Sequence, residues 1–288
     1  MRIGWLSTGR DAAARTLLSE VVRRAARDGI ALDIPVVFCD RERGESAESE
    51  AFLDLAAEFG LNAVTLSSAA SWRAWRSGSD PSGRGRLPNR QAVRDAWRKA
   101  YHEEVAELLA PYGVDLLVLA GYMLIASPEM CERFVMLNLH PALPGGPQGT
   151  WQQVIWQLLA DEADETGALM NLATAELDRG PVVAYCSFPI IGFRWDRLWH
   201  AFRKKRDALG LEALIAAEGE REPLFAEVRR QGERHEIPLL YHTIKAFARD
   251  DLIVRDGEIV GVTTELPLAL SDEVEAELEA EERTKGET

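Results

Sequence analysis

Hydrophobic and polar positions alternate along the first half of the chain in blocks that predict strands and helices in turn. Helical spacing of apolar side chains predicts a helix between Asp11, which can cap it, and Gly29, which can end it. Residues 46–59 and 94–109 predict two further helices. Short apolar runs predict strands at residues 3–7, 34–39, 63–66, 115–120 and 135–139. This alternation predicts an α/β fold with a mostly parallel central sheet flanked by helices, and ligands at the carboxyl ends of the strands.

The second half of the chain predicts a more mixed set of elements. Residues 151–159 suit a short helix and residues 237–248 a further one. Residues 167–174 and 182–188 predict an antiparallel pair, with Asp178 in the connection. The chain then closes with a hairpin of residues 252–255 and 258–260 around Asp256-Gly257.

Two segments exceed a minimal α/β domain. Residues 67–89 are rich in Ser, Gly, Arg and Pro and predict a long surface excursion that could act as a flexible lid. Residues 193–219 mix Trp and Leu with charges and predict one or two amphipathic helices. Either insertion could cover a site, form a homodimer contact, or be surface decoration. We expect a catalytic domain at 1–260 and an acidic tail at 261–288, with a solvated helix or frayed end over residues 271–288.

Composition narrows the class of protein. The chain has 288 residues, of which 47% are hydrophobic, enough for a sizeable core. No apolar run approaches membrane-spanning length, and residues 1–6 enter a strand pattern instead of a signal sequence, so we expect a cytoplasmic protein without a membrane partner. Cys39, Cys131 and Cys186 lie far apart, which predicts no disulfide scaffold and no metal site. A formal charge of −14 argues against a nucleic-acid partner, although local basic patches can still bind a small anion.

The segment that carries chemistry runs from Asn138 through His140 and Pro141 to Gly146. Side chains two residues apart on a strand point to the same side, and the Pro and Gly residues must end that strand. An Asn amide can donate a hydrogen bond to a developing oxyanion, and an imidazole can pass a proton or lend its charge. Asp178, in the turn Glu176-Leu177-Asp178-Arg179-Gly180-Pro181, could hold that His cationic and relay protons through a water. Taken singly, these residues are better explained as a strand cap, a core His and a turn Asp, but packing hardly explains the combination.

These two motifs, with residues 115–123 just upstream, resemble the signatures of the folate-dependent formyltransferases, most closely the phosphoribosylglycinamide formyltransferases. The resemblance covers about residues 1–260 and implies a formyltransferase-type Rossmann-like fold with two insertions. It implies transfer of a formyl group from 10-formyltetrahydrofolate, the co-substrate, to a primary amine, most closely glycinamide ribonucleotide of purine biosynthesis. The alternatives are a sugar-amine formyltransferase, a formyltetrahydrofolate hydrolase and, outside enzymes, an anion- or nucleotide-binding module. The intact motifs disfavour the module, and the absence of G-x-G-x-x-G weakens its dinucleotide version.

The resemblance also implies roles for single residues. Asn138 would polarise the formyl oxygen, His140 would assist the tetrahedral intermediate, and Asp178 would hold the water that moves protons. Arg98 matches a basic residue that meets the glutamyl tail of the donor, although a solvated helix Arg explains it equally well. The other residues expected to bind the donor are Met123, Leu124, Ile125, Ala126, Asn171, Thr174, Ala175 and Glu176.

The acceptor side departs from the family. The family usually carries a Gly-Ser-Asn type loop whose amides cradle a phosphate, where this chain has Gly9, Arg10, Asp11 and Ala12. Amides at a helix start still favour an anion, but Asp11 would repel one, and Arg10 could compensate. Leu124 and Asn171 stand where the family often has Arg and His, and the loop after Pro141 is short. The remaining residues expected on the acceptor side are Gly121, Pro141, Arg230 and Glu233, the last two aligned across the second insertion.

Overall fold

The computed structural model describes residues 1–77, 89–176 and 179–286. The chain forms two compact units built from interleaved segments. Unit 1 comprises Met1–Asn138, Asn171–Pro181 and Lys245–Thr264, and unit 2 comprises Leu139–Met170, Val182–Ile244 and Glu265–Thr288. The division at residue 260 that the sequence suggests stays a prediction. Within the described residues, no helix has the length and apolar character needed to cross a membrane.

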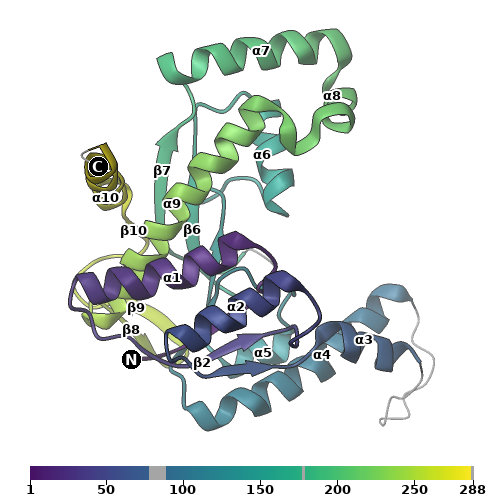
Figure 1. The fold of residues 1–288 in the computed structure, drawn as a ribbon, viewed down its shortest axis with the longest axis vertical. Coiled ribbons are helices and arrows are strands. Elements are labelled where there is room, and N and C mark those ends of the chain that lie inside the picture. The colour runs from purple at the N-terminus through teal and green to yellow at the C-terminus, as the bar shows by residue number, and fades with distance from the viewer. Residues whose placement is uncertain (78–88, 177–178, 287–288) are drawn as a thin grey trace. The chain divides into compact units, whose positions relative to one another are not determined.

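Unit 1 has the predicted parallel sheet (Figure 1). Its strands are β1 (Arg2–Ser7), β2 (Asp33–Cys39), β3 (Ala63–Thr65), β4 (Leu116–Leu119) and β5 (Met136–His140). They lie in the order β5-β4-β1-β2-β3, and each neighbouring pair is parallel. The register aligns Leu6 with Leu119 and Leu119 with Asn138. The loops after β1 and β4 therefore begin at the same carboxyl edge as Asn138, where ligands bind in open α/β sheets.

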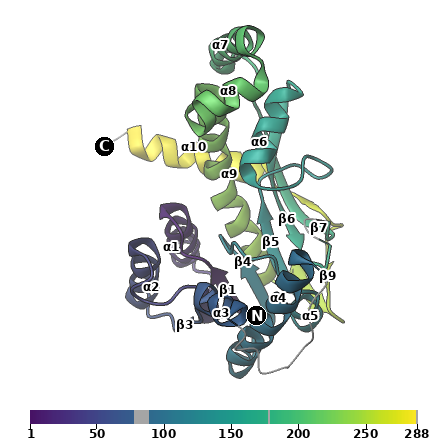
Figure 2. The same cartoon turned by 90° about the vertical axis from the view of Figure 1, so that its right-hand side faces the viewer.

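The helices of unit 1 begin at polar caps. They are α1 (Ala12–Arg27), α2 (Ala47–Glu58), α3 (Ser68–Arg76), α4 (Arg90–Leu109) with the 3₁₀ turn η1 (Ala110–Tyr112), and α5 (Pro128–Arg133). Helices α1 and α2 lie side by side (Figure 2). The side chain of Asp11 caps α1, as the sequence predicts, and the side chain of Ser46 caps α2. Helix α4 begins earlier than predicted, because Asn89 caps it by accepting a hydrogen bond from the Ala92 amide.

The first part of the long surface excursion predicted over residues 67–89 forms helix α3. Trp72 packs edge-on against Trp97 of α4, with ring centroids 5.2 Å apart. The Trp97 indole donates a hydrogen bond to Ser71 Oγ at 3.0 Å. Aromatic side chains among Ser and Arg thus give this helix a partly buried face, although none of its residues is fully buried. The remainder of the excursion, residues 78–88, lies outside the described residues.

The closing hairpin of unit 1 agrees with the sequence prediction. Strands β8 (Leu252–Arg255) and β9 (Glu258–Gly261) pair antiparallel. Asp256 and Gly257, the central residues of the turn, have φ of 53° and 80°. Positive φ at both positions is what a type I′ hairpin turn requires, and the Asp-Gly pair supplies it at low cost.

Unit 2 contains β6 (Glu165–Leu172), β7 (Val182–Pro189) and β10 (Leu268–Ala269), in the order β10-β7-β6. Its helices are α6 (Trp151–Ala160), α7 (Phe193–Leu209), α8 (Leu211–Glu218), the 3₁₀ turn η2 (Gly219–Arg221), α9 (Pro223–Ala248) and α10 (Ser271–Gly286). Helices α7 and α8 confirm the prediction of one or two amphipathic helices over residues 193–219. They share a buried cluster with α9 that includes Trp195, Trp199, Phe202, Leu214, Leu224 and Phe225.

Helix α9 is longer than the predicted helix over residues 237–248. It begins at Pro223, a residue suited to a first helical turn, and Glu222 Oε2 accepts a hydrogen bond from the Phe225 amide. Pro238 lies inside the helix, where the loss of one amide donor is costly. Burial of Leu239 and other apolar side chains on both sides of Pro238 outweighs that cost.

Residues 271–286 of the predicted solvated helix or frayed end form helix α10, which has one buried face instead of being solvated all round. Val274 and Leu278 of α10 are buried. Close polar contacts join the helix to α9, with His235 Nε2 2.9 Å from Glu275 Oε1 and His242 Nε2 2.8 Å from Glu277 Oε2. The helix therefore has an apolar contact face, and two of its glutamates also contact α9.

Candidate active site

The motif residues Asn138 and His140 both belong to strand β5. Asn138 Nδ2 donates a hydrogen bond to Asn171 Oδ1 at 3.2 Å. Asn171 lies near the end of β6 and is buried, with 2% of its surface exposed. A buried, hydrogen-bonded partner fixes the plane of the Asn138 amide, which an isolated strand residue could not do. The resemblance implies that Asn171 binds the donor, which stays a prediction. The structure adds its contact with Asn138.

His140 is buried, and its Nε2 lies 3.3 Å from the carbonyl oxygen of Pro147. Because a carbonyl oxygen can only accept, this contact places a proton on Nε2 and makes Nδ1 the basic nitrogen of the neutral ring. A tight turn brings the chain back to Pro147. Gly146 donates its amide to the Leu143 carbonyl at 2.8 Å, and Gly145 has a φ of 77°, which fits the third position of a type II turn after Pro144.

Asp178 lies outside the described residues, so its expected place in the site stays a prediction. Hydrogen bonds fix the connection on either side of it. Leu172 donates its amide to the Pro181 carbonyl at 2.9 Å, and Thr174 Oγ1 donates to the Glu176 carbonyl at 3.0 Å. A Cβ atom on Gly180 would lie 1.6 Å from the Leu172 carbonyl oxygen, so only glycine fits there. This close approach explains the Gly in the Glu176–Pro181 motif.

The turn after β4 carries the residues expected to bind the donor. Two hydrogen bonds fix it to the end of β1, from the Thr8 amide to the Gly121 carbonyl and from the Met123 amide to Thr8 Oγ1, each 2.9 Å long. Met123 and Ile125 are 49% and 39% exposed. Large apolar side chains exposed on an anchored turn are suited to contact a flat aromatic ligand.

His102 of α4 is a buried polar residue that sequence reasoning did not single out. Its Nε2 lies 3.2 Å from the Tyr122 hydroxyl, and its Nδ1 accepts a hydrogen bond from the Ser127 amide at 3.1 Å. Burial, followed by the nearby charge of Arg98, lowers the pKa of His102 to about 4. The signal available in the sequence was a His on the apolar face of a helix, which in general predicts only a core residue.

Arg98 lies one turn before His102 on α4. Its guanidinium contacts Asp95 at 3.2 Å, and its side chain is 20% exposed. The side chain is therefore half-buried, which differs from the fully solvated helix Arg considered as its alternative. Its expected contact with the donor stays a prediction.

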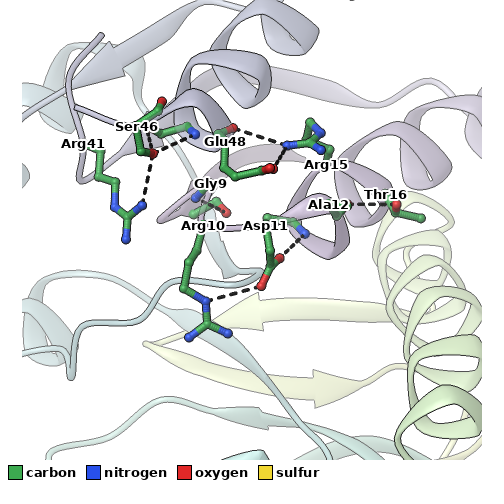
Figure 3. A network of polar contacts seen from close by, with 12 residues as sticks. Gly9, Arg10, Asp11, Ala12, Arg15, Thr16, Arg41, Ser46 and Glu48 are labelled. Atoms are coloured by element: carbon green, nitrogen blue, oxygen red, sulfur yellow. Dashed lines mark hydrogen bonds and ion pairs between the residues drawn. The ribbon is translucent and has the colours of Figure 1, made fainter. Parts of the chain in front are cut away.

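The loop after β1 replaces the expected anion cradle with an acidic cap (Figure 3). Asp11 Oδ1 accepts the Ala14 amide at 3.1 Å, and Asp11 Oδ2 lies 3.3 Å from Arg10 Nε. Gly9 has a φ of 55°, and a Cβ atom there would lie 3.0 Å from the Phe52 side chain. A carboxylate thus occupies the amino-terminal end of α1, the position where a bound anion would be most favoured.

Arg230 and Glu233, expected near the acceptor, lie on helix α9 in unit 2. Arg230 forms two hydrogen bonds with Glu227, of 2.8 Å and 2.7 Å, which hold the pKa of that carboxyl at about 2. Glu233 pairs with Arg229 at 2.8 Å. Both residues are engaged in ion pairs along their own helix, and their acceptor roles stay predictions.

The family match lies on the motif-bearing part of the chain. Residues 68–197 match the family described as formyl transferase. A phosphoribosylglycinamide formyltransferase from Mycobacterium tuberculosis (strain ATCC 25618 / H37Rv) is 33% identical over 126 residues, which cover 43% of this chain and 56% of that protein. The chain spans about half the length of the curated relatives it matches.

Solved structures match over nearly the whole chain. Glycinamide ribonucleotide transformylase 1 from Symbiobacterium toebii has a TM-score of 0.55 at 24% identity, covering 91% of this chain and 93% of that one. A formyltetrahydrofolate deformylase from Pseudomonas syringae has a TM-score of 0.56 at 18% identity, covering 90% of this chain and 65% of that one. At these identities the likeness establishes the fold, which confirms the predicted formyltransferase-type α/β class.

The family match includes both sequence motifs, the turn after β4 and Arg98, whereas the loop after β1 and Arg230 fall outside it. The resemblance to the folate-dependent formyltransferases is therefore confirmed, and residues 68–197 are the part of the chain that matches the formyl transferase family.

Proposed function

We propose that this chain is an enzyme that transfers a formyl group from 10-formyltetrahydrofolate to a primary amine, and that the amine is glycinamide ribonucleotide. The observation that carries the proposal is the Asn138-Leu139-His140-Pro141 motif at the end of β5, with the Asn138 amide oriented by Asn171, inside the segment that matches the formyl transferase family. The names of the curated relatives support the choice of acceptor.

In the proposed reaction, the neutral amine adds to the formyl carbon and a tetrahedral oxyanion forms. Asn138 Nδ2 donates a hydrogen bond to that oxygen, and His140 in its protonated form stabilises the same charge. The bond between the formyl carbon and the donor nitrogen then breaks. Asp178 holds the water that carries the proton from the attacking amine to the leaving nitrogen, so that charge and protons balance.

The donor binds along the turn from Met123 to Ala126, where the exposed Met123 and Ile125 side chains contact the pterin ring. Backbone groups of the Thr174–Glu176 segment pair with the edge of that ring. Arg98 meets the carboxylates at the far end of the donor, since a guanidinium is well matched to carboxylate geometry.

A second candidate changes the acceptor. The Asp11 carboxylate occupies the amino-terminal end of α1, where an acceptor phosphate would otherwise bind, and two anions there would repel one another. This observation favours an unphosphorylated amine or water as acceptor, the latter giving a formyltetrahydrofolate hydrolase. Asn138, His140 and Asp178 would keep the same roles in either reaction.

An acceptor panel tests the proposal. Purified protein with 10-formyltetrahydrofolate should consume donor only when glycinamide ribonucleotide is added, with one formylated product for each donor consumed. Donor loss at an equal rate without amine would instead establish the hydrolase, and transfer to an unphosphorylated amine alone would establish a different acceptor. No donor consumption and no folate-induced rise in Tm would contradict both candidates.

A further inference from the structure

A single imidazole holds both ends of the turn that follows β4. His102 Nε2 lies 3.2 Å from the hydroxyl of Tyr122, at the start of the turn. His102 Nδ1 accepts the amide proton of Ser127, at its end, over 3.1 Å. The residues between these anchors are the four expected to bind the donor, so one side chain on α4 sets the span of that segment.

The second contact fixes the tautomer of His102. A backbone amide can only donate, so Nδ1 must be unprotonated and must accept. The proton of the neutral ring therefore sits on Nε2, which donates to the Tyr122 oxygen. Both ring nitrogens are used, one as donor and one as acceptor, and a doubly protonated ring would lose the Ser127 contact.

The surroundings keep His102 neutral. It is 1% exposed, and burial together with the charge of Arg98 holds its pKa at about 4. The Tyr122 ring packs edge-on against Phe38, with centroids 6.3 Å apart. The contact with Phe38 therefore holds the Tyr122 ring in the core independently of His102, and the hydroxyl of that ring reaches His102.

We infer that His102 is a positioning residue for the folate donor, acting through Tyr122 and Ser127 to hold residues 123–126 in their binding conformation. The inference rests on the proposed function for the identity of the ligand. Helix α4 then contributes to donor binding in two ways, directly through Arg98 and indirectly through His102. If His102 had only a structural role, its substitution would lower stability and would not affect the binding of one substrate more than the other.

Three variants separate the two contacts. Tyr122→Phe removes the hydroxyl and keeps the ring, and His102→Asn keeps an acceptor for the Ser127 amide and loses the contact with Tyr122. His102→Leu removes both contacts. We expect the donor KM to rise about threefold to tenfold in each of the first two and by more in the third, with the acceptor KM unchanged. Because Tyr122→Phe and His102→Asn remove the same hydrogen bond, their effects in the double variant should not add.

The measurements are steady-state kinetics with each substrate varied, binding of a folate analogue by calorimetry, and Tm for each variant. His200→Asn is the control, because His200 is exposed on α7. A fall in Tm with an unchanged donor KM, or equal losses toward both substrates, would overturn the inference and leave a structural His102.

A second readout does not depend on activity. Nitrogen NMR of the wild-type protein should show His102 with an unprotonated Nδ1 and a protonated Nε2 at pH 7, and the opposite tautomer would overturn the inference. If the wild-type protein binds no folate at all, the proposed function fails and this inference falls with it. Normal wild-type transfer with unaltered donor KM in all three variants would refute only the inference.

Discussion

Asn138 Nδ2 donates a hydrogen bond to Asn171 Oδ1 across 3.2 Å, so that an amide ending one strand is oriented by an amide near the end of another. An amide can rotate about its last side-chain torsion, and only a fixed partner keeps its N–H group in the direction that transition-state stabilisation needs. Asn171 stands where the family often has His. Both residue types can accept a hydrogen bond, so the replacement can preserve the contact with Asn138.

The first prediction concerns this contact. Asn171→Leu removes the acceptor for Asn138 Nδ2, so we expect kcat to fall about tenfold with a smaller change in either KM. Asn171→His keeps a neutral acceptor, of the residue type that the family often has there, and should retain most of the activity. Equal losses in both variants would show that Asn171 acts by contacting the donor or by packing, and circular dichroism would establish that both remain folded.

Much of the fold could be predicted because local signals agreed with the final structure. Apolar runs marked the parallel strands, Asp11 marked a cap, and the Asp256-Gly257 pair marked a turn with little competition. The errors arose where burial overrode local preference. The helix predicted over residues 237–248 is shorter than α9, which begins at Pro223, and the acidic residues of α10 concealed the buried Val274 and Leu278.

The site was predicted unevenly for a related reason. Asn138 and His140 are two residues apart in one strand, so their shared side follows from the alternation of side chains along it. His102 meets Tyr122 and Ser127 only through the packing of α4 against the turn after β4, and no sequence spacing encodes that contact. The capping role of Asp11 followed from sequence, whereas its pairing with Arg10 required the structure.

The second prediction concerns the proposed catalytic groups. His140→Ala and Asp178→Asn should each lower kcat by about two orders of magnitude or more, because each removes a charged or proton-transferring group from the transition state. Asn138→Ala should have a similar effect. Folate-analogue binding should persist in all three, since the turn after β4 is unchanged. Folded variants with nearly normal formyl transfer would place the catalytic centre elsewhere.

The third prediction concerns the acidic helix α10. Leu278 is 5% exposed, so Leu278→Ala leaves a cavity and should reduce the free energy of unfolding by about 2–4 kcal/mol. Glu279→Ala, at the exposed neighbouring position, should change it by less than about 0.5 kcal/mol. Urea titrations of the two variants and the wild type measure the difference. Equal stability of all three would mean that the helix contributes nothing to the fold, as a frayed tail would.

The fourth prediction concerns pH. The pKa of His102 is lowered from its ordinary value of 6.5 to about 4, chiefly by burial. Between these values the unfolded chain binds a proton at His102 and the folded chain does not, so the free energy of unfolding falls as the pH falls. At pH 4.5 this residue should cost the folded state about 2–3 kcal/mol relative to pH 7.5. Urea titrations of His102→Asn at the two pH values should show a correspondingly smaller loss than the wild type, whereas the exposed His200→Asn control should match it.

The last prediction concerns the loop after β1, where Asp11 caps α1 and also pairs with Arg10. Asp11→Asn keeps a capping oxygen but removes the negative charge, so it should leave Tm nearly unchanged and lower the KM for a phosphorylated acceptor. Arg10→Ala should raise that KM several-fold, because Arg10 supplies the positive charge nearest to the helix start, while donor binding stays unchanged. Inorganic phosphate should compete with the acceptor, and more strongly in Asp11→Asn than in the wild type. If neither variant alters the acceptor KM and phosphate does not compete, the acceptor carries no phosphate at this loop, and the panel of unphosphorylated amines becomes the decisive assay.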